Sequence, residues 1–271
     1  MLARNLIVLV GVIQLSTAPA GAAILRRAAR GSRPAASGVS QRKRLHINDL
    51  IAEPGTVEVD WALLYSGTTN LLSMPSAIKF TPEGNSLLAG RTEYSIAFDS
   101  IDSAVNAGGR TTQFSDRLTL AATSVVFDSK HFDLAVAPQV TTLLRNDSGM
   151  RAGATLIGRV DAGGNSFGIS GAWSGATSTS STNPAGIWDL GIGYGRHLAA
   201  TGFAARITPH VNATLEKATG FERTLSVFAG IEYQCTAKTA LDLTAQRYNL
   251  AGGIPDRQLL LGITVNLGKI R

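Results

Sequence analysis

The sequence predicts an all-β protein, a single antiparallel up-and-down transmembrane β-barrel of about twelve strands. Three observations predict it. Apolar residues recur at every second position from Thr56 onward, the longest apolar run is too short for a membrane-spanning helix, and the chain opens with an export signal.

The first element is a signal peptide at residues 1–22. Arg4 precedes an apolar run over residues 6–15, and small residues follow. This run holds about ten residues, half of the ~20 that a helix needs to cross the hydrocarbon core. Cleavage after Ala20 or after Ala22 places small residues where the signal peptidase requires them, and the sequence leaves both sites open.

Residues 23–55 are expected to form a basic arm ahead of the barrel. Residues 1–48 contain eight of the 25 basic residues and none of the 19 acidic ones, so the rest of the chain carries 17 basic against 19 acidic residues. The high isoelectric point therefore belongs to the leader and the arm and does not indicate a nucleic-acid partner. The arm has too few large apolar groups to fold alone. We expect it to lie in the periplasm as a mobile segment; the alternative is that it enters the barrel as a plug.

The barrel is predicted over residues 56–271, and its alternation is clear in the first strand. Trp61, Leu63 and Tyr65 share one face there, whereas Glu58 and Asp60 lie on the other. Glycine, asparagine, aspartate, serine or proline fill most of the breaks between such runs, as turns require. The predicted strands are 56–66, 72–80, 91–99, 117–127, 132–144, 150–161, 165–176, 187–196, 203–216, 221–235, 239–248 and 257–268.

The face opposite the apolar one distinguishes a membrane barrel from a soluble sheet. A soluble sheet needs one dry face, whereas a membrane barrel turns its apolar face to lipid and its polar face to a water-filled lumen. A soluble exported sandwich or barrel remains the alternative. The residues expected to line the pore are Glu58, Asp60, Arg91, Glu93, Asp133, Arg151, Arg159, Asp161, Arg206, His210, Glu216, Glu232 and Asp242. Lys79, Asp99, Asp189 and Glu222 are assigned to the same face. Aromatic residues near strand ends, expected at the membrane interfaces, are Tyr65, Phe80, Phe98, Phe127, Tyr233 and Tyr248.

Catalytic, metal and cofactor sites are not predicted. Cys235 is the single cysteine, and the four histidines show no metal-type spacing. His210 is the one candidate for an acid/base cluster, with Glu222, Ser226 and Glu232 on the neighbouring strand. We favour the interpretation that these inward groups set the polarity of the pore.

The chain resembles a family of outer-membrane β-barrel proteins related to the outer-membrane transporters of the phenol-degradation pathway. The resemblance is carried by LHINDLIAEPGTVEVDWALLYS (45–66), GRTEYSIAFDS (90–100), TTQFSD (111–116), NPAGIWDLGIGYGRHL (183–198), TPHVNATLEK (208–217) and DRQLLLGITVNLG (256–268). It implies a barrel in the bacterial outer membrane. The chain departs from such barrels at its end, because it finishes on Arg271 rather than on an aromatic residue.

These observations lead to two functional hypotheses. The first is a non-enzymatic, narrow channel or transporter for small solutes, hydrophobic or aromatic ones among them. The second is a non-conducting structural or adhesive barrel whose loops at 100–116 and 177–186 bind partners. The expected partners are outer-membrane lipid, a small-molecule solute and the outer-membrane assembly machinery.

Overall fold

The fold is taken from a computed structural model. It describes residues 51–52, 54–67, 71–83, 91–106, 109–113, 117–129, 131–143, 149–162, 164–179, 184–198, 201–248 and 256–269. The predicted signal peptide and the arm as far as residue 50 lie outside the described residues. Within the described part of the chain, no helix is long and apolar enough to span a membrane.

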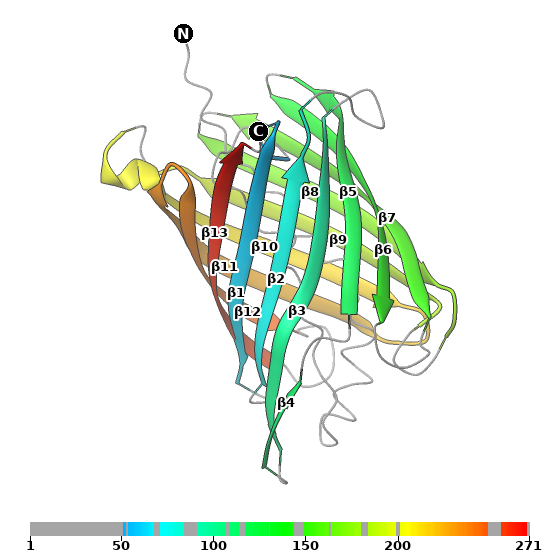
Figure 1. The fold of residues 1–271 in the computed structure, drawn as a ribbon. Helices are drawn as coiled ribbons and strands as arrows, with labels where there is room; N and C mark the ends of the chain where they lie inside the picture. The colour runs from blue at the N-terminus through cyan, green and yellow to red at the C-terminus, as the bar shows by residue number, and fades with distance from the viewer. Residues whose placement is uncertain are drawn as a thin grey trace.

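Twelve antiparallel strands form a closed barrel (Figure 1). Each strand pairs with its neighbours along the chain, and β1 pairs with both β2 and β13, so the sheet has no free edge around the ring. The ring strands are β1 (Thr56–Ser66), β2 (Leu71–Thr81), β3 (Thr92–Asn106), β5 (Arg117–Asp128), β6 (Phe132–Leu143), β7 (Met150–Ala162), β8 (Asn165–Ala176), β9 (Gly186–Arg196), β10 (Ile207–Ala218), β11 (Arg223–Thr236), β12 (Thr239–Tyr248) and β13 (Asp256–Lys269). The predicted fold class and strand number are confirmed.

Two elements differ from the prediction. Strand β3 continues to Asn106 and pairs there with a short strand β4 (Gly109–Gln113), so much of the predicted loop 100–116 is β-structure. The strand predicted over 203–216 begins instead as a 3-10 turn, η1 (Phe203–Arg206), and β10 starts at Ile207. Both differences lie at the ends of the barrel wall, where apolar and polar residues no longer alternate strictly.

Apolar side chains cover the outer face of the barrel. In β1, Trp61, Leu63 and Tyr65 are exposed, while the intervening Ala62 and Leu64 are buried. Ile169, Trp188, Leu190 and Ile192 are likewise exposed, on β8 and β9. Large apolar side chains that face outward in this number fit a lipid environment rather than water.

Aromatic pairs lie on this outer face near the two ends of the strands. Trp173 of β8 and Trp188 of β9 have ring centroids 6.2 Å apart at one end, and Phe167 and Tyr194 of the same strands lie 5.1 Å apart at the other. Of the predicted interfacial residues, Tyr65, Phe80 and Phe127 are exposed, Phe98 and Tyr233 are partly buried, and the side chain of Tyr248 lies outside the described set. Aromatic residues gathered at two levels, one near each membrane interface, are typical of membrane barrels.

The two ends of the barrel are named here by what lies at them. At the end where β1 begins and β13 finishes, called the terminal end, β7–β8 and β11–β12 are joined by two residues each, and β2–β3 and β9–β10 by ten residues each. At the opposite end, called the loop end, lie the connections 144–149, 177–185 and 249–255, and the β3–β4 hairpin projects there (Figure 1).

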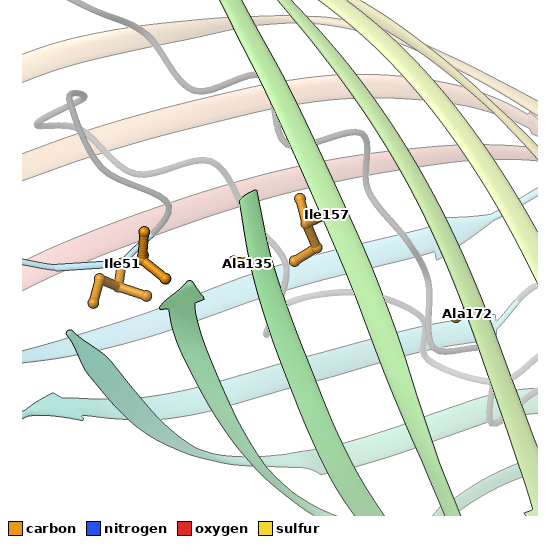
Figure 2. Packing of buried hydrophobic residues seen from close by; sticks show 5 residues of the cluster. Ile51, Ala135, Ile157 and Ala172 are labelled. Carbon is orange, nitrogen blue, oxygen red and sulfur yellow. The ribbon is translucent and has the colours of Figure 1, made fainter. Parts of the chain in front are cut away.

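The first described residue, Ile51, lies inside the barrel. It is fully buried and belongs to a cluster with inward-facing residues of four neighbouring strands, namely Val125 of β5, Ala135 of β6, Ile157 of β7 and Ala172 of β8 (Figure 2). The described end of the predicted arm therefore lies in the interior, beside this part of the wall.

Candidate pore

The interior of the barrel is rich in acids. Nine acidic and three basic residues are buried among those whose side chains the structure describes. Small hydroxyl residues such as Ser170, Thr214 and Ser226 fill much of the remaining inner face. The acids are Glu58, Asp60, Glu93, Asp133, Asp161, Asp189, Glu216, Glu232 and Asp256, and the basic residues are Lys79, Arg151 and Arg159.

Nine of the thirteen residues predicted to line the pore are buried, and two more, His210 and Asp242, are partly buried. The other two lie at the terminal end of the barrel. Arg91 precedes β3 and forms an exposed ion pair with Asp128 at 3.3 Å. Arg206 ends η1 and donates to the carbonyl of Cys235 at 3.4 Å.

The four further residues that the sequence assigned to the inner face also differ in burial. Lys79 and Asp189 are buried as expected, whereas Glu222 is exposed in the turn ahead of β11. The side chain of Asp99 lies outside the described set. Asp256 was missed because the predicted last strand began one residue after it.

Two ion pairs connect interior charges across neighbouring strands. Lys79 of β2 pairs with Asp60 of β1, and both side chains are almost completely buried. Arg159 of β7 lies between Asp161 of its own strand and Asp133, its register partner on β6. Removing one member of a buried pair leaves an uncompensated charge, so these two groups stabilise the wall only as intact sets.

Acids face one another on the strands β9 to β12. Asp189 of β9 is the register partner of Glu216 of β10, and Glu232 of β11 is the partner of Asp242 of β12. Directly opposed residues on one face have their Cβ atoms about 5 Å apart, where like charges repel. We call these four residues the acidic wall. No basic residue among the buried side chains lies on β9 to β12.

A hydrogen-bonded chain crosses this wall at His210. The Nε2 atom of His210 is 3.1 Å from the Thr244 hydroxyl, which donates to Asp242 Oδ1 at 2.7 Å. Gly230 of β11 lies between the two strands, and a Cβ atom there would come within 2.7 Å of His210 Nε2. The glycine thus lets side chains from β10 and β12 meet across β11.

The structure separates one member, Glu222, from the acid/base cluster that the sequence suggested around His210. Glu222 is exposed, and the described contacts of His210 run to Thr244 and Asp242. Within the described residues, no group of three histidine, cysteine or acidic side chains is arranged to hold a metal ion.

Together these features define a closed antiparallel barrel with an apolar outside and an acidic, polar inside. Among solved structures, the chain is similar to the COG4313 outer-membrane channel from Pseudomonas putida F1, with a TM-score of 0.57 and 12% identity over 80% of this chain and 97% of that one. It is similar to the NanC porin, with a TM-score of 0.56 and 11% identity over 77% and 100% of the two chains. The KdgM porin has a TM-score of 0.51 and 8% identity over 78% and 99%.

No protein-family model and no curated protein matches the chain. At identities this low, the three structures establish that the chain shares the fold of outer-membrane porins and channels. All three are described as porins or channels and none as an enzyme.

Proposed function

We propose that this protein is a narrow outer-membrane channel for small solutes and that it prefers cations to anions. The observation that carries the proposal is a closed ring of twelve strands with apolar side chains outside and, among the described side chains, a surplus of acids inside. Carboxylates along a pore lower the energy of cations and raise that of anions. The ring size supports a narrow passage, since twelve strands lie between the filled eight-stranded barrels and the open sixteen-stranded porins.

The acidic wall sets this chain apart from a channel for acidic oligosaccharides. The KdgM porin was solved in complex with oligogalacturonate, which carries many carboxylates. In this chain the four acids of the wall would repel such a solute. We therefore expect neutral or positively charged solutes.

The second part of the proposal is that the solutes include hydrophobic or aromatic molecules. Val125, Ala135, Ile157 and Ala172 form an apolar patch on the inner wall, which Ile51 covers. An apolar surface inside a polar barrel is suited to the apolar part of a small molecule. Uptake of phenol by cells with and without the protein tests this part and the relation to phenol-degradation transporters that the sequence resemblance suggests.

The test of cation preference is the reversal potential of the refolded protein in a planar bilayer under a salt gradient. Replacing Asp189 with Asn and Glu216 with Gln should move the reversal potential toward zero or toward anion preference. Gln246→Glu adds a buried acid on β12, two strands from β10, and should move the reversal potential the other way. If the reversal potential stays the same in both variants, these side chains do not lie on the conduction path.

Export and insertion complete the proposal. We infer that a signal peptide is removed and that the assembly machinery inserts the barrel into the bacterial outer membrane. The apolar outer face and the signal-like first 22 residues support this. Cell fractionation tests it, because a mature chain in the periplasmic or cytoplasmic fraction would contradict the proposed location.

A non-conducting structural or adhesive barrel is the second candidate. Ile51 inside the lumen and the buried Lys79–Asp60 pair favour it, because both fill interior space. In that case deletion of the β8–β9 loop at 177–185 and the β3–β4 hairpin should abolish partner binding, while the protein conducts neither before nor after. Conductance of the intact protein would contradict it.

A further inference from the structure

One aromatic residue faces the interior among the side chains that the structure describes. Phe228 of β11 is buried, and so are Ser226 and Glu232, which lie an even number of positions away on the same strand. No other aromatic side chain in the described part of the chain is buried. The face of an aromatic ring carries partial negative charge and attracts C–H groups and the edges of other rings. Phe228 therefore gives the polar inner wall one flat apolar surface.

Two amide side chains flank this ring. Asn212 of β10 and Gln246 of β12 are the register partners of Phe228 on its two neighbouring strands, and both are buried. Directly opposed residues on one face of a sheet have their Cβ atoms about 5 Å apart. The two amides therefore stand on either side of the ring, at the same level of the barrel.

Each of these amides has a polar atom without a partner in the described part of the chain. Asn212 Oδ1 and Gln246 Nε2 are buried and form no hydrogen bond there. Gln258, the register partner of Gln246 on β13, differs, since its amide donates to Asp256 Oδ2 at 2.9 Å. A buried donor or acceptor without a partner raises the free energy of the protein. The ring thus has an acceptor on one side and a donor on the other, and a solute that bonds both atoms would be stabilised.

The residues around the ring favour a neutral solute. Each acid of the acidic wall lies four positions along its strand from the level of Phe228, which is about 13 Å, with one pair toward the loop end and the other toward the terminal end. On the far side of Asn212, Gly193 of β9 stands at the same level and adds no side chain to the wall. The register partners of the ring are uncharged, so a solute there meets amides between two pairs of acids.

We propose that Phe228, Asn212 and Gln246 form a binding site for a neutral, ring-shaped solute that carries hydroxyl groups. The flat face of the solute packs on the Phe228 ring, while hydroxyl groups at its edge donate to Asn212 Oδ1 and accept from Gln246 Nε2. Cyclic sugars and phenols share this chemistry. The proposal rests on the channel function proposed above and gives the passing solute a place to bind on β10 to β12, away from the apolar patch on β5 to β8.

The experiment is saturation-transfer NMR on the full-length refolded protein in detergent, with methyl β-glucopyranoside and phenol as separate probes. At least one probe should receive saturation from the protein. Phe228→Leu keeps an apolar side chain but removes the flat ring, and Asn212→Leu removes the acceptor; each should weaken binding of that probe about tenfold. Phe167→Leu is the matched control, because it removes the same ring from the outer face and should leave binding unchanged.

Heat-modifiable migration on gels shows which variants form the barrel, and the two lumen variants test the site independently of each other. Transfer to the glucoside identifies a sugar as the solute class, and transfer to phenol alone identifies an aromatic alcohol. The site is overturned if neither probe binds, or if binding is the same in the folded lumen variants as in the unmodified protein. Planar-bilayer conductance separates this inference from the channel function: a conducting protein that binds neither probe loses the site alone, whereas a silent protein that binds one loses the channel alone.

Discussion

The assignment of lipid and lumen faces is tested most directly in the last strand, by Leu261→Arg. Leu261 lies near the middle of β13, is half-exposed, and has Leu63 of β1 and Leu243 of β12 as its register partners. All three leucines face outward. An arginine on the lipid face at the bilayer midplane costs about 2–4 kcal/mol. We expect a loss of that size in the free energy of unfolding.

Thr264→Arg is the matched variant on the inner face. Thr264 is buried, and its register partners are Asp60 of β1 and Ala240 of β12, so an arginine there has a carboxylate within reach. Its cost is steric and should be smaller than that at Leu261. The assay is urea unfolding in phosphatidylcholine vesicles, followed by tryptophan fluorescence. Equal losses at the two positions would refute the assignment of the faces.

Three further predictions concern the fold and the processing of the chain. Detergent-extracted protein should show a β-type circular dichroism spectrum and heat-modifiable migration; a mainly helical spectrum would exclude the barrel. Gly153→Ala should destabilise the protein by about 1–3 kcal/mol, since its Cβ would lie 2.8 Å from the Cα of Ser174, whereas Gly171→Ala, with nothing nearer than 3.7 Å, should be neutral in the same unfolding assay. Mass spectrometry of the mature protein should find a chain that begins after Ala20 or Ala22, and an intact first residue would remove the signal peptide from the proposal.

The strand count could be predicted because the bilayer imposes one rule on every strand. Side chains such as Trp61 and Leu261 must face lipid, and their neighbours must face inward, so a period of two is present in each crossing. Outside the bilayer that rule no longer applies. Strand β4 and the end of β3 project at the loop end. Polar residues stand there at successive positions, so the sequence lacks the alternation from which these strands could have been predicted.

The contacts inside the barrel could be predicted only in part. Parity places Asp60 and Lys79 on the inner face, but their pairing depends on the register between β1 and β2, which the sequence does not supply. The burial of Ile51 was still harder to predict. It lies in a short apolar stretch, Leu50 to Ala52, without periodicity, and the residues of its cluster lie 74 or more positions later in the chain.

The interior charges divide into two groups with different consequences. On β1, β2, β6 and β7, the acids Asp60, Asp133 and Asp161 contact Lys79 or Arg159, so neutralising one of them disturbs a buried pair and costs stability. On β9 to β12 the acids of the acidic wall face one another across neighbouring strands, so in the proposed channel neutralising one of them changes the potential that a passing ion meets. In the proposed channel, a cation is therefore expected to be drawn to the side of the lumen formed by β9 to β12.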